Sequence, residues 1–217
     1  MADSGATAAA LQHQFDDVEQ QHDASTLGMW IFLVTEIMFF GGVFTAYVAY
    51  RSAYAGAFAH ASNHLNLVLG TVNTAVLITS SLTMALAVHA AQLGHRRRLL
   101  VWLVLTMTLG ITFLVIKGIE YGHKFEEGLV PGPAFTYAGP DAPQAQLFFS
   151  IYFTLTGIHA LHMIIGIVVL AVLVLRAREG RFGASYYTPV ELTGLYWHFV
   201  DIVWIFLFPL LYLLGRR

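Results

Sequence analysis

The sequence predicts an all-α membrane protein, a single bundle of five transmembrane helices. Of the 217 residues, 57% are hydrophobic and only 11% are charged, whereas soluble domains usually carry about 25% charged residues. Five apolar segments each exceed the about 20 residues that cross the hydrocarbon core as a helix. They are residues 27–50, 65–91, 99–119, 147–175 and 190–214.

Polar turns and helix breakers divide these segments. Residues 95–98 read His-Arg-Arg-Arg and separate the second segment from the third, and Pro and Gly residues recur in 131–140 before the fourth. Three arginines in residues 176–181 follow the fourth segment. Pro209 lies within the fifth segment and predicts a bend there.

The distribution of arginines predicts which terminus lies in the cytoplasm. Because the number of spans is odd, the N-terminus shares one side of the membrane with loops 96–98 and 176–181, which carry six arginines. Short arginine-rich loops stay in the cytoplasm. We therefore expect a cytoplasmic N-terminus and an external C-terminus. The basic residues expected outside are Arg51, Lys124, Arg216 and Arg217, with Lys117 at the margin.

Residues 1–26 are expected to form a cytoplasmic tail before the transmembrane domain of residues 27–217. The tail contains five acidic residues and no Lys or Arg. A secretory signal begins with basic residues and a mitochondrial transit peptide is rich in arginine, so neither is predicted. The tail is either a solvated acidic segment or, with His13 and His22 among its acids, a surface that collects protons.

Composition excludes several kinds of chemistry. The chain has no cysteine, which excludes disulfides, thiolate catalysis, iron–sulfur clusters and zinc–thiolate sites. It also lacks a Gly-rich phosphate loop and a Gly-x-Ser-x-Gly elbow. A net charge of −2 gives no basic surface for nucleic acid.

Five ionisable residues lie near the middle of three spans: Glu36 in the first, His159 and His162 in the fourth, and His198 and Asp201 in the fifth. Ionisable groups at this depth need a partner and indicate function. Within each of the last two spans the i, i+3 spacing places the two side chains on one helix face, close enough to touch. We expect all five to meet in one polar cluster, because mutual hydrogen bonds lower the free energy of burying them.

This expected cluster has several interpretations. Two histidines can contribute to a metal or haem site, but a metal site needs further ligands, and interhelical hydrogen bonds are the alternative. Glu36 has two interpretations of equal weight: a residue with a proton-linked or partner-contacting role, or a residue that packs helices together. A proton-coupled transporter and a b-type membrane cytochrome are candidate functions, although we find no internal repeat of the transporter kind. We assign no metal ligand and no catalytic residue.

Three further polar residues have simpler interpretations. Asn73 lies among Ser and Thr residues of the second span, and small polar residues let helices pack closely. Lys117 and Glu120 have i, i+3 spacing at the outer end of the third span, so we expect them to pair or to reach lipid headgroups.

Motifs in all five spans, taken in order, resemble subunit III of the haem–copper terminal oxidases, above all that of cytochrome c oxidase. The longer members of this family have two additional helices at their N-terminus, so the chain resembles the short bacterial form. This resemblance implies a bacterial plasma membrane, with the C-terminus in the periplasm. The motifs are residues 27–40 around Glu36, Asn73-Thr74, residues 108–110 with Glu120-Tyr121, the Gly-x-His-x-Leu-His segment 157–162, and Tyr196 followed by the Trp-His-Phe-x-Asp-x-Val-Trp segment 197–204.

The resemblance implies a non-redox subunit of an aa3- or caa3-type cytochrome c oxidase. In this family the haems and copper lie in subunits I and II. Subunit III packs against subunit I, supports proton uptake from the cytoplasmic side, protects the catalytic subunit during turnover and binds phospholipid. The family's buried polar positions correspond to Glu36, His159, His162, His198 and Asp201, with Glu120 and Asn73 as secondary positions.

The resemblance leaves three points open. Quinol oxidases also have five-helix third subunits, although Glu36 and the Tyr196-Trp197 pair favour the cytochrome c branch. Lipid in the longer members lies beside the two helices that this chain lacks, so its lipid-binding residues are unknown. Small subunits and a respiratory supercomplex are further partners that the sequence does not resolve.

Overall fold

The computed structural model describes residues 13–215, and five of its helices are long and apolar enough to cross a membrane. A short helix, α3 (Ala55–Ser62), follows the first of them. The predicted all-α, five-span architecture is therefore confirmed. The long helices are α2 (Val18–Ala53), α4 (Leu67–Gln92), α5 (Arg96–Glu126), α6 (Ala142–Arg178) and α7 (Thr188–Phe208), which continues into the π-helical η1 (Pro209–Leu213).

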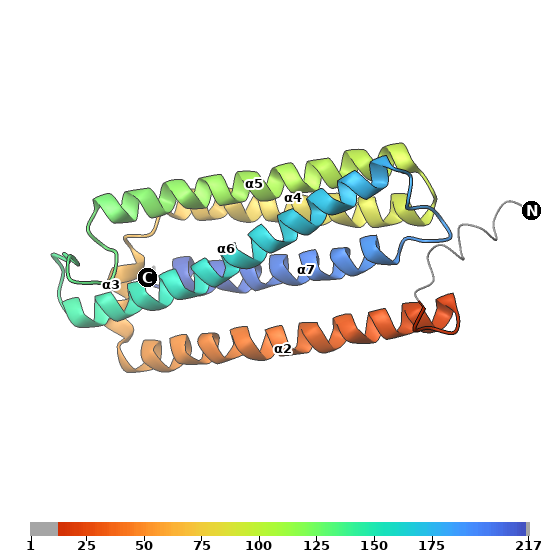
Figure 1. Cartoon of the computed structure of the whole chain (residues 1–217). Coiled ribbons are helices and arrows are strands. Elements are labelled where there is room, and N and C mark those ends of the chain that lie inside the picture. Colours follow the sequence, from red (N-terminus) through yellow and green to blue (C-terminus); the bar gives the residue numbers. More distant parts are fainter. Residues whose placement is uncertain (1–12, 216–217) are drawn as a thin grey trace, which may run out of the picture.

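The long helices form a bundle in which α2 is the outermost member (Figure 1). α4 and α5 run side by side, α6 crosses α5 and α7 at an angle, and α7 lies between α4 and α2. In the most apolar stretch of α2 only 11% of the residues are buried, against 56% in the α7–η1 span. Most of the α2 surface therefore faces lipid or another protein.

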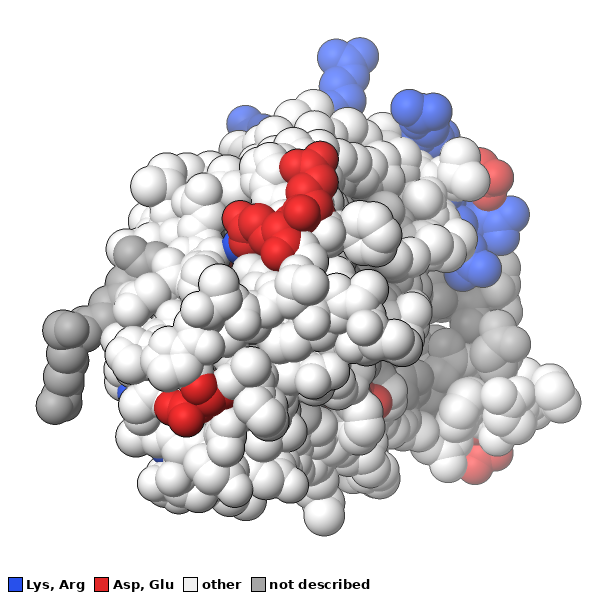
Figure 2. Space-filling view, turned by 90° about the vertical axis from the view of Figure 1, so that its left-hand side faces the viewer, with Lys and Arg blue, Asp and Glu red and all other residues white. Residues whose placement is uncertain are grey.

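The turns of the bundle gather at two ends (Figure 1). The start of α2, the α4–α5 turn and the α6–α7 loop lie at one end, which we name the arginine end because residues 96–98 and 176–181 are there. The opposite end, the α3 end, also holds the α5–α6 loop. Figure 2 looks onto the α3 end, where acidic side chains stand on a largely uncharged face. Arg216 and Arg217, expected at this end, lie outside the described residues.

Glycines end three of the long helices. Gly94, Gly128 and Gly180 follow α4, α5 and α6, with φ angles of 68°, 68° and 79°. Such left-handed residues satisfy the last carbonyl groups of a helix, and glycine adopts this conformation without a steric penalty. These glycines fix where each helix stops and where each connection turns back.

Several helix boundaries differ from the expected spans. α2 begins at Val18, within the expected tail, because the Asp17 side chain caps it by accepting a hydrogen bond from the Gln20 amide at 2.7 Å. α5 and α6 also extend beyond their apolar segments. A helix can continue past the apolar segment because its backbone N–H and C=O groups remain hydrogen-bonded to each other. Residues 1–12 of the expected tail lie outside the described residues.

Two glycines let Trp197 fill the centre of the bundle. The Trp197 side chain is fully buried, and a Cβ atom added at Gly110 or Gly166 would lie 2.8 or 2.9 Å from its ring. The indole Nε1 donates a hydrogen bond to the Ser80 hydroxyl at 2.9 Å. Trp197 therefore fixes α7 against α4, α5 and α6, and with it the depth of the polar residues that follow.

Candidate functional site

Glu36 and His162 form a polar contact between α2 and α6. Glu36 Oε2 lies 3.1 Å from His162 Nε2, and the two side chains are 19% and 12% exposed. His162 Nδ1 lies 2.9 Å from the Ile158 carbonyl oxygen, which can only accept, so Nδ1 carries a hydrogen. The contact at Nε2 therefore needs one further proton, which is either on the carboxyl group or on the imidazole.

His198 bonds a different helix from the one that the sequence analysis expected. Its Nδ1 lies 2.8 Å from the Ser81 hydroxyl of α4, and it makes no hydrogen bond with Asp201. Asp201 is 3% exposed, and neither carboxyl oxygen has a hydrogen-bond partner among residues 13–215. Ser81, His198 and Asp201 line a cavity of about 250 Å³ between α4 and α7.

His159 lies apart from both contacts. Its ring is fully buried and packs against Phe113 and Trp204, with centroid separations of 5.4 and 5.2 Å. Neither ring nitrogen has a hydrogen-bond partner within the described chain. Because these polar groups are distributed over separate helix contacts, the expectation of one shared cluster is wrong. The i, i+3 spacing placed His198 and Asp201 on one helix face, since both line the α4–α7 cavity, but it did not give the neighbouring helix.

The most completely bonded polar group is one that the sequence analysis treated as secondary. Lys117 Nζ lies 2.9 Å from Glu120 Oε2 and donates to the hydroxyls of Tyr152 and Tyr212 at 3.0 and 2.7 Å. The Tyr212 hydroxyl in turn donates to Glu120 Oε1 at 2.6 Å. Lys117 and Glu120 are 2% and 1% exposed. The expected pairing is confirmed, and it occurs inside the protein rather than at lipid headgroups.

Aromatic rings surround the Lys117 ammonium group. Its Nζ lies 4.8 to 5.5 Å from the centroids of four rings, which places a cation over π-electron density. The rings belong to Tyr121, Tyr152, Trp204 and Tyr212. Sequence reasoning missed the two tyrosines that bond Lys117, because they lie on α6 and η1, far from it in the sequence. We name Lys117, Glu120, Tyr152 and Tyr212 the lysine cluster.

Asn73 and its neighbours join α4 to α5. Asn73 Nδ2 donates to the Phe113 carbonyl oxygen at 3.4 Å, and the hydroxyls of Thr83 and Thr106 lie 2.8 Å apart. Both contacts are buried. Asn73 and Thr83 therefore join α4 to α5 by buried polar contacts.

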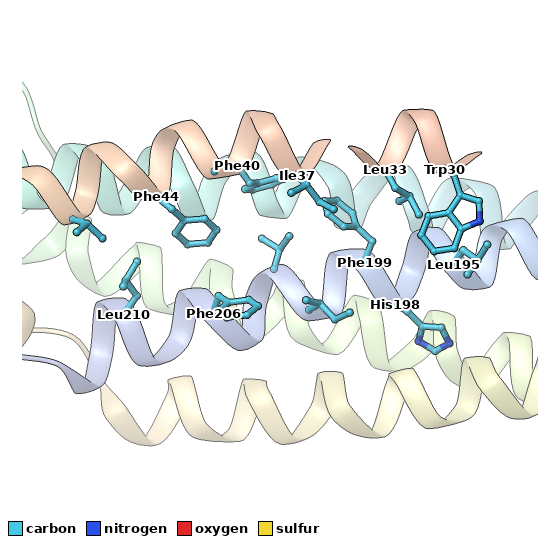
Figure 3. Close-up of a pocket in the computed structure, with 14 residues that line it drawn as sticks. Trp30, Leu33, Ile37, Phe40, Phe44, Leu195, His198, Phe199, Phe206 and Leu210 are labelled. Carbon is cyan, nitrogen blue, oxygen red and sulfur yellow. The ribbon is translucent and has the colours of Figure 1, made fainter. Parts of the chain in front are cut away.

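An apolar groove of about 690 Å³ runs between α2 and α7. Figure 3 shows Phe40 and Phe44 of α2 facing Phe199, Phe206 and Leu210 of α7 and η1 across it. His198 lies at its margin, so one residue borders both this groove and the α4–α7 cavity. The lining suits acyl chains or apolar side chains and offers few groups for a polar substrate.

The described part of the chain offers no group of three or more His, Asp or Glu side chains that could hold a metal ion. The polar groups of the bundle instead act mainly in pairs between helices. Their chemistry is therefore that of hydrogen bonding and ion pairing at helix contacts.

Comparison with known proteins gives one consistent family. A model of the family described as cytochrome c oxidase subunit III matches residues 12–216. Cytochrome c oxidase subunit 3 of Corynebacterium diphtheriae is 34% identical over 86% of this chain and 86% of its own length. The protein of the same name from Thermostichus vulcanus is 31% identical over 99% and 97%. Subunit 3 of the cytochrome bo(3) ubiquinol oxidase of Pseudomonas aeruginosa is 30% identical over 97% and 94%.

Proposed function

The chain belongs to the cytochrome c oxidase subunit III family, and we propose that it is the non-redox third subunit of an aa3- or caa3-type cytochrome c oxidase in a bacterial plasma membrane. Family membership makes it an integral membrane subunit of a haem–copper oxidase complex. In our proposal the haems and copper belong to partner subunits I and II, and subunit I is the direct neighbour. This chain stabilises subunit I and supplies no catalytic residue.

One observation carries this proposal: three of the five polar residues of the family motifs, Glu36, His162 and His198, bond neighbouring helices, and the five do not converge on a reaction site. Glu36 bonds His162 between α2 and α6, and His198 bonds Ser81 between α7 and α4. A transporter or a b-type cytochrome needs groups that converge on a bound ion, substrate or haem. This distribution supports a scaffold that holds a catalytic neighbour.

The start of α2 supports a role in proton uptake. Asp16, Asp17, Glu19 and Asp23 are exposed there, and His22 Nδ1 lies 3.2 Å from the Thr188 hydroxyl at the start of α7. The acids thus lie at and just before the start of a helix that is fixed to the bundle at the arginine end. We propose that this end faces the cytoplasm and that its acids collect protons for the catalytic subunit.

Co-purification tests the scaffold role. A tagged form of the full chain, solubilised gently from its native membranes, should bring down a haem–copper subunit in fixed proportion, with its characteristic visible spectrum. A tagged membrane protein of another complex in the same cells serves as the control. Recovery of the chain without any haem–copper subunit would overturn the proposal.

The electron donor needs a separate measurement, because one relative belongs to a ubiquinol oxidase. The co-purified complex should oxidise reduced cytochrome c faster than ubiquinol. The second candidate function is therefore the third subunit of a quinol oxidase. Rapid turnover with ubiquinol and none with cytochrome c would replace our first choice by this one.

We also propose that the α2–α7 groove binds the acyl chains of a phospholipid in the assembled complex. Gly41 lines this groove, and a Cβ atom added there meets nothing within 4 Å. Gly41→Phe should fill part of the groove and lower the phospholipid retained by the purified complex. Gly28→Phe is the matched control, because Gly28 also lies open on α2 but outside the groove. Equal lipid retention in both variants would exclude the groove as the lipid site.

A further inference from the structure

A second groove lies on the bundle surface between α4 and α5, at the arginine end. It has a volume of about 420 Å³ and combines basic side chains with an apolar floor. Arg97, Arg98, His89 and His95 contribute its polar groups, and Leu86 and Val101 are among its apolar lining. It shares no lining residue with the α2–α7 groove.

The two arginines in this groove have no acidic partner. Within the described residues neither Arg97 nor Arg98 makes an ion pair or a side-chain hydrogen bond, whereas Arg96 donates to the carbonyl groups of Ala177 and Arg178. No Asp or Glu occurs between Glu36 and Glu120 in the sequence, so α4 and the facing part of α5 supply no carboxylate. The charge of the groove therefore fits an anion from outside these helices.

The depth of the groove matches the boundary between lipid headgroups and acyl chains. Arg97 and Arg98 lie at the start of α5, and Val101, which is 62% exposed, lies one turn further into the span. Trp102 lines the same groove, and tryptophan side chains favour this interface. A ligand that fits both the basic part and the apolar part of this groove has a negatively charged headgroup and apolar chains.

We propose that the α4–α5 groove binds an anionic phospholipid, with Arg97 and Arg98 holding the phosphodiester and with an acyl chain lying along Leu86 and Val101. Guanidinium groups donate paired hydrogen bonds to phosphate oxygens, and basic sites between membrane helices bind such headgroups. The site depends only on the chain being embedded in a membrane, so it holds for either electron donor and for either orientation.

Photolabelling of the intact complex tests this site. The complex is reconstituted into vesicles containing a photoactivatable phosphatidylglycerol, or the matching phosphatidylcholine, with the reactive group on the acyl chain. Peptide mapping should place the phosphatidylglycerol label on residues 86–102 in large excess over the phosphatidylcholine label. Arg97→Gln/Arg98→Gln should reduce that label about thirtyfold, the scale expected when two basic side chains are removed from anionic headgroups.

A matched variant separates a specific site from general attraction. Arg176→Gln/Arg178→Gln removes the same charge at the same end of the bundle. Arg176 and Arg178 are exposed and do not line the groove, so we expect this double variant to leave the label unchanged. Equal labelling by the two lipids, or equal loss in the two double variants, would overturn the proposal. Loss of the label in millimolar inorganic phosphate would also overturn the proposal, because it would indicate a site for free anions. Absence of any label on residues 86–102 would show that another subunit covers the groove, which also overturns it.

Discussion

Glu120 and Glu36 are both carboxyl groups that contact a basic side chain inside this bundle, but their surroundings differ. Glu120 is 1% exposed and belongs to the lysine cluster, which joins α5, α6 and η1. The Glu36 side chain is 19% exposed and, among residues 13–215, forms its hydrogen bond with His162, across the contact between α2 and α6. The first pair lies within the bundle, whereas the second attaches its outermost helix.

This difference has a physical consequence for how each pair responds to change. A buried charge that loses its partner stays in a medium of low polarity and strongly destabilises the fold. A partly exposed pair on an outer helix can move toward lipid or toward another subunit when its bond is lost. We therefore expect the lysine cluster to control the stability of the chain and the Glu36–His162 contact to control the position of α2.

The largest effect is expected from Lys117→Met. This change leaves the Glu120 carboxylate buried without its cation and removes the donor for two tyrosine hydroxyls. Removal of one partner of a buried ion pair costs about 3–5 kcal/mol. We expect the unfolding free energy of the full chain in mixed micelles to fall by this amount, as measured by titration with a denaturing detergent.

A double variant distinguishes a stranded charge from lost packing. Lys117→Met/Glu120→Gln removes both charges and keeps an acceptor for Tyr212, so it should recover most of the lost stability. If the double variant were as unstable as the single one, the lysine cluster would stabilise the fold by packing and not through its paired charges.

Tyr212→Phe should have the next largest effect, because this hydroxyl bonds both charged residues. It accepts from Lys117 Nζ at 2.7 Å and donates to Glu120 at 2.6 Å. A buried charged group that loses a hydrogen bond costs about 1–3 kcal/mol. The same detergent titration measures the loss. Tyr50→Phe is the control, because Tyr50 is 44% exposed and the change there should be near zero; equal effects would show that η1 is not held by these bonds.

Sequence reasoning predicted the elements of this molecule better than the contacts between them. Length and hydropathy define a transmembrane helix locally, so the five spans followed from short windows of sequence. The spacing of Lys117 and Glu120 also predicted their pairing, since both lie on one helix. In both cases the residues that determine the feature lie within about one helical turn or one span of the sequence.

The partners from other helices could not be predicted in this way. His198 was expected to touch Asp201 on its own helix, but the rotation of α7 brings it to Ser81 of α4. That rotation depends on Trp197, which fits beside Gly110 and Gly166 on two further helices. Helix packing angles arise from many such contacts, and no single motif contains them.

Glu36→Ala tests the peripheral pair and should cost less than either change in the lysine cluster. A hydrogen bond between membrane helices stabilises by about 0.6 kcal/mol on average and seldom by more than about 1.7 kcal/mol. Glu36→Gln should retain most of this, because the amide can donate to His162 Nε2 as a protonated carboxyl group does. Detergent titration of the full chain measures both variants, and a loss from Glu36→Ala as large as that from Lys117→Met would remove the distinction between the two regions.

The smallest effect is expected from Ser81→Ala, which removes the hydroxyl 2.8 Å from His198 Nδ1. The expected loss is below about 0.6 kcal/mol, the average for such bonds, because Asp201 lines the same α4–α7 cavity as His198 and can replace the Ser81 hydroxyl as its partner. Thr79→Ala is the matched control, since the exposed Thr79 hydroxyl donates to the Ala75 carbonyl of its own helix and to no other group of the described chain, so its loss should leave the interhelical contacts unchanged. If Ser81→Ala cost more than Glu36→Ala, then α7 would depend more on its polar contact with α4 than α2 does on its contact with α6. The outer helix would then be held mainly by apolar packing.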